Sequence, residues 1–216
     1  GKLAGIFTVT DACRHFAVRR PEQAPRAGAV DAAWAVVPAE AVTPPHGYDR
    51  RMDKPREFLP LSIAVLTVSD TRTFETDTSG ALLVSRLEDA GHLLGDRALE
   101  PDDMYRIRAT VSAWIADPGI QVVITTGGTG VTGRDGTPEA IKPLLDKVIE
   151  GFGEMFRRIS WDDIGTSTLS SRCLAGVANG TYIFCLPGSS NACSTGWDQL
   201  IASQLDYRTR PCNLAE

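Results

Sequence analysis

From residue 61 onward, the chain alternates between two patterns of apolar and polar positions. An apolar run at residues 61–68 and a β-branched run without a breaker at residues 120–124 predict buried strands, and a further strand is predicted roughly over residues 93–99. Between these runs, apolar residues recur at helical spacing. One predicted helix begins near Thr78 or Ser79 and stops at Gly91, and the next stops at Pro118-Gly119. The alternation predicts βαβ units.

The second half of the chain continues the pattern with one antiparallel unit. Thr137-Pro138-Glu139 predicts a helix start, with Thr137 as the N-cap. Asn179-Gly180 predicts the two-residue turn of a hairpin formed by residues 173–186. Further helices are predicted around residues 152–159 and over 192–205. Together these elements predict an α/β fold with a mainly parallel sheet covered by helices on both faces.

Ligands in open α/β sheets bind beyond the carboxyl ends of the strands. Four predicted strand ends carry polar or glycine-rich loops, and we expect these loops to converge on one pocket: Ser69-Asp70, Asp102-Asp103, residues 125–130 and Pro187-Gly188-Ser189.

The central loop is Thr125-Thr126-Gly127-Gly128-Thr129-Gly130, between a predicted strand and a predicted helix. Glycines without Cβ atoms let backbone N–H groups approach an anion, and the helix dipole favours negative charge nearby. The stretch therefore predicts a phosphate- or oxyanion-binding loop.

Other interpretations of this loop fit less well. Residues 128–133 match G-x-G-x-x-G, with Glu150 as a possible ribose-binding acid, but Arg134, Asp135 and Gly136 separate the glycines from the helix start. A Walker loop lacks its lysine. A tight structural turn without a ligand remains an alternative.

Asp70, Asp102 and Asp135 stand at or near the predicted strand ends. Carboxylates near a phosphate loop would repel an anionic ligand unless a cation lies between them, and Mg²⁺ typically binds through one or two carboxylates plus substrate phosphates. Alternatively, each Asp caps a turn or a helix. Arg172 supplies a cation that either pairs with phosphate or lies on the hairpin surface.

Composition narrows the partners. The net charge is −5 and no dense Lys/Arg run occurs, so nucleic acid and anionic membranes are poor candidates. The apolar runs are far shorter than the ~20 residues of a membrane span. The five cysteines show no C-x-x-C spacing, and the first residues lack a signal-peptide pattern. These features favour a reducing cytoplasm.

Residues 1–57 differ from the rest. Residues 1–16 resemble the closing strand and helix of a CBS domain. Three explanations of this resemblance are a truncated fusion partner, an upstream translation artefact and a local coincidence. Residues 19–60 are rich in Ala, Pro and Arg, which is typical of a linker. Because Met52 precedes the regular part, we expect residues 1–51 to be dispensable, and we assign the functional domain to residues 58–216.

Residues 58–216 resemble the MoaB/Mog family of molybdenum cofactor biosynthesis proteins, to which the gephyrin G domain also belongs. The resemblance covers about three-quarters of the chain and rests on strings that occur in order: 63–70 (IAVLTVSD), 77–80 (DTSG), 125–130 (TTGGTG), 134–139 (RDGTPE), 150–154 (EGFGE), 171–172 (SR), 186–189 (LPGS) and 210–213 (RPCN). The segment from Ala192-Cys193 to Arg210-Pro211-Cys212-Asn213 is similar to the MoaB branch.

The resemblance implies a three-layer α/β/α fold and a homotrimer or homohexamer that binds molybdopterin. Active relatives adenylylate molybdopterin with ATP and Mg²⁺ and release pyrophosphate. Asp102 and Asp135 match the family's two essential carboxylates, which would hold Mg²⁺, and other matching positions would bind substrate phosphate: Ser69, Asp70, Thr126, Gly127, Gly128, Thr129, Gly130, Thr137, Pro138, Arg172, Pro187, Gly188 and Ser189.

Two departures leave a second function class open. This chain has Ser190 and Asn191 where the family often has Pro and Lys, which bears on phosphate contacts in that loop. The MoaB branch also includes proteins of doubtful activity, so the alternative is a molybdopterin-binding or assembly protein without turnover, with other proteins of the pathway as partners.

Phe152, Met155, Phe156 and Trp161 either form a subunit interface or fill the core.

Overall fold

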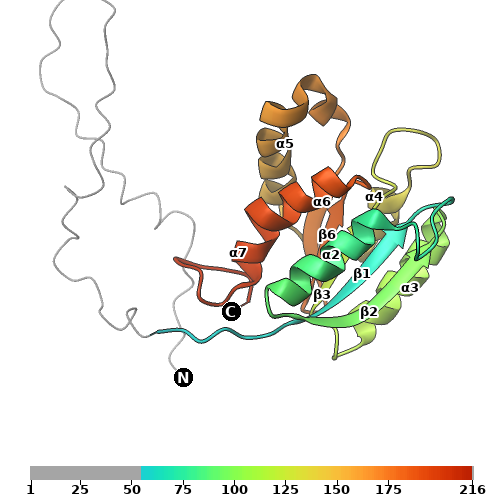
Figure 1. The fold of residues 1–216 in the computed structure, drawn as a ribbon. Coiled ribbons are helices and arrows are strands. Elements are labelled where there is room, and N and C mark those ends of the chain that lie inside the picture. Colours follow the sequence, from blue (N-terminus) through green and yellow to red (C-terminus); the bar gives the residue numbers. More distant parts are fainter. Residues whose placement is uncertain (1–54, 216) are drawn as a thin grey trace, which may run out of the picture. The chain divides into compact units, whose positions relative to one another are not determined.

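The computed structural model describes residues 55–215, so the predictions for residues 1–54 lie outside the described residues. The described residues form a six-stranded sheet of order β2-β1-β3-β6-β5-β4 (Figure 1). Its strands are β1 (Ser62–Val68), β2 (Leu93–Glu100), β3 (Val122–Thr126), β4 (Lys147–Val148), β5 (Leu174–Ala178) and β6 (Thr181–Leu186). The pairs β1–β2, β1–β3 and β3–β6 are parallel, while β5 is antiparallel to β6 and β4. The predicted mainly parallel sheet is confirmed.

Helices follow the strands at the predicted places. They are α2 (Thr78–Asp89), α3 (Met104–Ala116), α4 (Thr137–Ile141), α5 (Glu150–Ile164), α6 (Ser190–Gly196) and α7 (Ala202–Leu205). The 3₁₀ turns η3 (Lys142–Leu144) and η4 (Gly165–Ser170) follow α4 and α5, and the π-helical turn η5 (Trp197–Ile201) joins α6 to α7. The predicted helix over residues 192–205 is therefore continuous, with a π-helical middle. Among residues 55–215, no helix has the length and apolar character needed to cross a bilayer.

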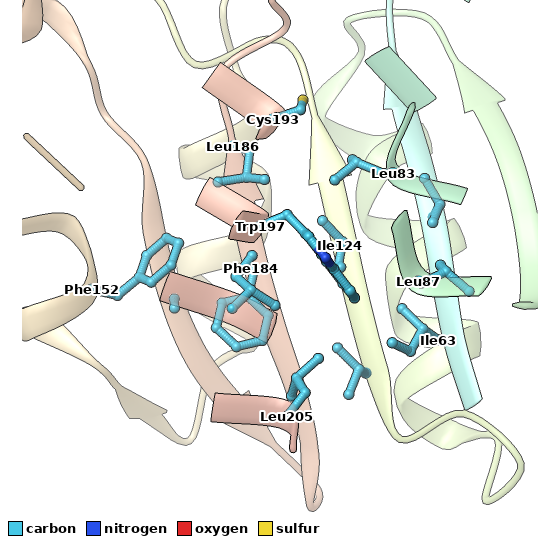
Figure 2. Packing of buried hydrophobic residues seen from close by; sticks show 14 of the residues in the cluster. Ile63, Leu83, Leu87, Ile124, Phe152, Phe184, Leu186, Cys193, Trp197 and Leu205 are labelled. Carbon is cyan, nitrogen blue, oxygen red and sulfur yellow. The ribbon is translucent and has the colours of Figure 1, made fainter. Parts of the chain in front are cut away.

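Each face of the sheet packs against its own set of helices, because side chains alternate along a strand. Ile63 and Val65 face the cluster that contains residues of α2, α5, α6 and α7 (Figure 2). Ala64 and Leu66 face the opposite cluster, which contains residues of α3 and α4. Two helical layers around one sheet confirm the three-layer α/β/α prediction.

The segment with crowded aromatic residues divides between core and surface. Phe152 and Phe156 are 8% and 2% exposed and pack in the first cluster. Met155 and Trp161, on the same helix α5, are 50% and 48% exposed. The core alternative is confirmed for Phe152 and Phe156, while the interface alternative stays a prediction for the exposed Met155 and Trp161.

Two predicted caps are wrong. Helix α2 is capped by Asp77, whose carboxylate accepts the Gly80 N–H, and not by Thr78 or Ser79. Helix α4 has Gly136 as its N-cap, without a side-chain hydrogen bond. Thr137 instead donates its hydroxyl to the Gly127 carbonyl at 2.9 Å, because that carbonyl lies close by in the folded chain. The hairpin turn is as predicted, with Asn179 and Gly180 at φ 49° and 82°.

Candidate functional site

The loops at the carboxyl ends of β1, β3 and β6 meet at one pocket of about 470 Å³. The predicted site residues that line it are Ser69, Thr126, Gly127, Gly128, Thr129, Gly130, Asp135, Pro187, Gly188 and Ser189. Residues from segments far apart in the sequence are thus brought together, as the position of strand ends in an α/β sheet leads one to expect.

The glycine loop depends on a backbone conformation that other residues rarely adopt. Gly127 and Gly128 have φ values of 105° and 63°. A Cβ atom on Gly127 would lie 2.2 Å from the Val68 carbonyl oxygen, so this loop packs directly on the end of β1. The Gly127 N–H donates to the Leu186 carbonyl at 3.1 Å, which ties the loop to the end of β6. The glycines are therefore required for the close approach of three strand ends.

Five predicted site residues do not line the pocket: Asp70, Asp102, Thr137, Pro138 and Arg172. Thr137 and Pro138 are buried at the start of α4, where Thr137 supports the glycine loop through its hydrogen bond to Gly127. The other three organise the loops around the pocket, each through contacts with protein atoms.

Asp70 links the ends of three strands. Its Oδ1 accepts the Asp102 N–H at 3.2 Å, and its Oδ2 pairs with Arg134 at 2.9 Å. Asp102 in turn accepts the Gly136 N–H through Oδ1 at 3.1 Å. The loops that follow β1, β2 and β3 are therefore held against one another by carboxylate hydrogen bonds.

The two predicted catalytic carboxylates differ in environment. Burial, with a further contribution from the charges of Asp135 and Asp70, raises the pKa of Asp102 above its ordinary value. Hydrogen bonds, first of all from the Thr132 hydroxyl, lower the pKa of Asp135. Both carboxylates adjoin the glycine loop: a Cβ on Gly128 would lie 2.9 Å from Asp102 Oδ2, and one on Gly130 would lie 2.7 Å from Asp135 Oδ2.

A magnesium ion fits this arrangement only with help from a substrate. Among residues 55–215, no group of three His, Cys, Asp or Glu side chains is placed to hold a metal alone. Mg²⁺, however, usually takes one or two carboxylates and completes its shell with water and phosphate oxygens. Burial is the main cause of the raised pKa of Asp102, and the neighbouring charges of Asp135 and Asp70 add to it; a divalent cation would offset these charges. Asp102 and Asp135 are the residues that would hold it.

Arg172 clamps the loop between the glycines and α4. Its Nε donates to the Gly130 carbonyl and its Nη2 to the Asp135 carbonyl, both at 2.7 Å, while Nη1 pairs with Glu139. All three guanidinium nitrogens contact protein atoms, and two of them hold the carbonyls of the pocket residues Gly130 and Asp135, so Arg172 positions Asp135.

Sequence reasoning missed the wall of the pocket formed by α2, α5, η4 and α6. The additional lining residues are polar for the most part: Thr67, Arg72, Thr78, Ser79, Ser160, Asp163, Ser167, Ser170, Ser171, Asn191 and Thr195. The string of residues 77–80 could have revealed the start of α2, because an Asp three residues before a glycine N–H is a typical cap. The residues of α5 and η4 carry no local signal of this kind.

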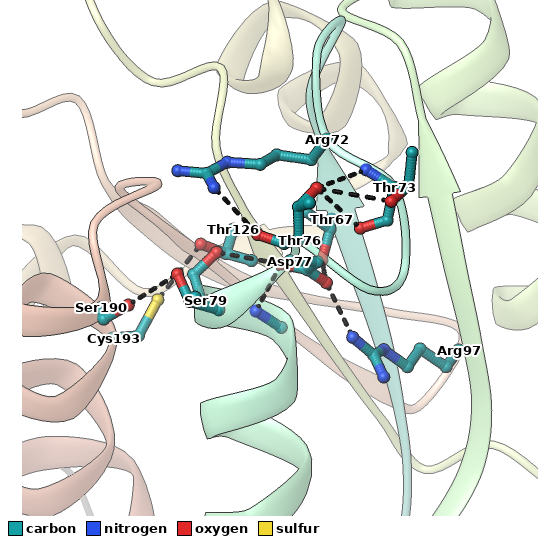
Figure 3. A network of polar contacts seen from close by, with 12 residues as sticks. Thr67, Arg72, Thr73, Thr76, Asp77, Ser79, Arg97, Thr126, Ser190 and Cys193 are labelled. Atoms are coloured by element: carbon teal, nitrogen blue, oxygen red, sulfur yellow. Dashed lines mark hydrogen bonds and ion pairs between the residues drawn. The ribbon is translucent and has the colours of Figure 1, made fainter.

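Asp77 anchors this wall (Figure 3). Its side chain is 1% exposed and accepts the Thr67 hydroxyl at 2.7 Å and the Arg97 guanidinium at 2.9 Å. Burial opposes the charge, but the hydrogen bonds from Thr67 and Gly80 and the pairing with Arg97 outweigh it, so the pKa of Asp77 is lowered. A fixed carboxylate thus holds the start of α2, with Thr78 and Ser79, at the pocket.

Ser190 and Asn191, the two departures from the family pattern, take part in contacts across the pocket rim. Ser190 donates its hydroxyl to Thr78 Oγ1 at 3.2 Å, which joins the starts of α6 and α2. Asn191 donates its amide to Asp163 Oδ2 at 2.7 Å, which joins α6 to α5.

Comparisons with known proteins agree with this geometry. The family described as "Probable molybdopterin binding domain" matches residues 64–207. Molybdenum cofactor biosynthesis protein B of Escherichia coli K12 is 57% identical over 157 residues, 73% of this chain and 92% of that protein. The protein of the same name from Bacillus subtilis is 44% identical over 147 residues, 68% of this chain and 86% of that protein.

Solved structures show the same relationship. A crystal structure of molybdenum cofactor biosynthesis protein B matches with a TM-score of 0.67 at 42% identity, over 70% of this chain and 93% of the other. The tungsten cofactor synthesizing protein MoaB of Pyrococcus furiosus matches with a TM-score of 0.57 at 38% identity, over 64% and 89%. The chain therefore belongs to the MoaB/Mog family of molybdenum cofactor biosynthesis proteins.

Proposed function

We propose that this chain binds molybdopterin and transfers the adenylyl group of ATP to it, with release of pyrophosphate. The observation that carries the proposal is the position of Asp102 and Asp135, which adjoin the glycine loop at Gly128 and Gly130. Two carboxylates beside an anion-binding loop suit a reaction between two phosphorylated substrates, provided that a cation offsets their charge.

The chemistry would proceed by in-line displacement. An oxygen of the pterin phosphate attacks the α-phosphorus of ATP, the new P–O bond forms, and the bond to the β-phosphate bridging oxygen breaks as pyrophosphate leaves. The glycine loop and the start of α2 would hold the phosphates through N–H and hydroxyl groups. Magnesium, when bound, would supply charge neutralisation between the carboxylates and the phosphates.

Replacement of the carboxylates tests this assignment. We expect Asp102→Asn and Asp135→Asn each to lower the rate of pyrophosphate release by roughly 100-fold or more, because each removes a negative charge that would hold Mg²⁺ at the phosphates. Both variants should retain the melting temperature of the wild type within a few degrees, since each Asn keeps a carbonyl that can accept the same N–H. Full activity in both variants would contradict the proposed roles.

The alternative is a molybdopterin-binding or assembly protein without turnover. Asn191 favours it, because its amide is bound to Asp163 and offers no charge to a phosphate at this position, where relatives often carry a lysine. Retention of both Asp102 and Asp135 favours the enzyme. Under the alternative, molybdopterin would bind but pyrophosphate would not form.

Cysteine chemistry supports a reducing compartment such as the cytoplasm. Within residues 55–215, Cys173, Cys185 and Cys193 are buried free thiols and Cys212 is an exposed one. Burial raises the pKa of Cys185 to about 12 and that of Cys193 to about 11, so neither is a ready nucleophile. The proposed mechanism therefore uses no cysteine.

A further inference from the structure

The pocket has one cationic side chain among the residues that the structure describes. Of the described residues that line it, Arg72 is the only Lys, Arg or His, whereas Asp135 and Asp163 contribute negative charge. A phosphate ester that enters this pocket needs a compensating cation on the protein, because a dianion otherwise meets carboxylates on two sides. The sequence around Arg72 gives no hint of this role, since an isolated Arg in a loop carries no signal.

The other arginines around the pocket are committed to protein partners. Arg172 binds the Gly130 and Asp135 carbonyls and Glu139. Arg134 pairs with Asp70, and Arg97 pairs with the buried Asp77. To recruit any of these three, a ligand would have to break an ion pair that holds the site together.

Arg72 is held in place yet keeps free donors. Its Nη1 donates to the Thr76 carbonyl at 2.9 Å, and its backbone N–H donates to Ser69 Oγ at 3.2 Å. Within residues 55–215, the structure records no other hydrogen bond of its guanidinium, so Nε and Nη2 remain available to a ligand. Thr76 is itself fixed, because its hydroxyl accepts the Thr73 N–H at 2.9 Å and Asp77 follows it directly (Figure 3).

The same wall offers neutral donors beside this cation. Thr78 and Ser79 line the pocket at the start of α2, a helix of 12 residues whose dipole favours an anion there. Thr78 is positioned by the hydroxyl of Ser190. The Ser79 hydroxyl donates to Asp77 Oδ1 at 3.3 Å, so the guanidinium, the Thr78 hydroxyl and the helix start form the arrangement suited to phosphate oxygens.

We propose that Arg72 is a phosphate-binding residue, with Thr78 and the start of α2 completing the contact. This inference rests on the proposed function, because a phosphorylated substrate is what brings an anion here. The guanidinium fork would bind two oxygens of one phosphate group, either the monoester of the pterin or the polyphosphate of ATP. Arg72 and the start of α2, which Asp77 fixes, thus form the phosphate wall of the pocket.

Equilibrium binding of two simple anions tests the proposal. Isothermal titration of the full chain with inorganic phosphate, and separately with pyrophosphate, in buffer with Mg²⁺ would compare wild type, Arg72→Gln and Arg72→Lys. Lys147→Gln is the control, because Lys147 is exposed on β4, outside the pocket, and the variant removes the same charge. We expect Arg72→Gln to weaken the binding of at least one of the two anions by about tenfold, the usual effect of one lost charged hydrogen-bond pair.

The anion affinity of Arg72→Lys should lie between those of wild type and Arg72→Gln, since lysine keeps the charge but not the fork of the guanidinium. The probe that loses affinity identifies the source of the phosphate: inorganic phosphate stands for the pterin monoester and pyrophosphate for ATP. Affinities of Arg72→Gln within twofold of wild type for both probes would overturn the inference, as would a wild-type chain that binds neither. Pyrophosphate release by the wild-type chain is measured separately. If the wild type releases no pyrophosphate but its anion binding depends on Arg72, only the proposed reaction is contradicted.

Discussion

Asp77 shows how one buried charge is stabilised at the site. The carboxylate is 1% exposed, and an isolated charge at such depth would be costly. Its bonds to Thr67, Arg97 and the Gly80 N–H compensate, so that the pKa falls below its ordinary value of 3.8. A group with a lowered folded-state pKa stabilises the fold above its unfolded pKa, and this contribution is lost as the pH falls through the folded pKa.

We therefore expect Asp77→Asn to lower the free energy of unfolding at pH 7 by about 3 kcal/mol, the effect of removing one partner of a buried pair. The difference from wild type should shrink as the pH falls below 3.8 towards the lowered pKa of the folded state, because the wild-type carboxylate then also loses its charge. Denaturant unfolding at pH 7 and pH 3 measures both effects. Asp89→Asn, at the exposed end of the same helix, is the control and should change little. If Asp77→Asn lowers the free energy of unfolding equally at both pH values, the charge of Asp77 is not what stabilises the fold.

At the scale of elements, the glycine loop follows β3 and packs on the ends of β1 and β6. Gly127 cannot carry a side chain without two penalties: a positive φ and a Cβ only 2.2 Å from a backbone oxygen of β1. Gly133, six residues later in the same connection, has no positive φ, and a Cβ added to it would meet no atom within 4 Å. Gly127 thus lies in the packed part of this connection, and Gly133 lies in its open part.

Gly127→Ala should therefore reduce the free energy of unfolding by about 2 kcal/mol or more, while Gly133→Ala should leave it nearly unchanged. Urea unfolding followed by tryptophan fluorescence compares the two variants. Similar stabilities for both would mean that the loop can shift away from β1, and that its conformation is less constrained than its contacts indicate.

Local signals were enough for the elements and for the loops that line the pocket, but not for the contacts between these loops. The apolar runs and the Asn179-Gly180 turn act over a few residues, so the strands and the hairpin were predictable from sequence. The cap of α4 was mispredicted because Thr137 bonds instead to Gly127, a partner set by the folded loop. The prediction left Arg172 open between a phosphate contact and the hairpin surface and did not include Arg72, since their partners at residues 130–139 and at residue 76 are known only once the strands are ordered.

At the scale of the whole molecule, α5 and η4 leave apolar side chains uncovered. Met155, Trp161, Ile164 and Leu169 are between 46% and 77% exposed. Apolar side chains gathered on one segment usually mark an interface. With the family resemblance, this surface supports our prediction of a homotrimer or homohexamer, in which the same contact between two different surfaces repeats around a three-fold axis and closes the ring.

Light scattering at micromolar concentration tests this prediction. We expect a mass three or six times the 23.2 kDa of the chain. Leu169→Glu should shift the mass towards the monomer, because a charge at a buried interface is costly, whereas Leu93→Glu, at an exposed position of β2, should not. A wild-type mass near 23.2 kDa would contradict the prediction.

The most direct test of the proposed reaction is the yield of pyrophosphate when the wild-type chain is mixed with molybdopterin, ATP and Mg²⁺. Adenylyl transfer predicts one pyrophosphate for each pterin consumed, together with an adenylylated pterin detectable by mass spectrometry, and no pyrophosphate when molybdopterin is omitted. Binding of molybdopterin without any ATP-dependent pyrophosphate would contradict the proposal and leave the chain as a binding or assembly protein.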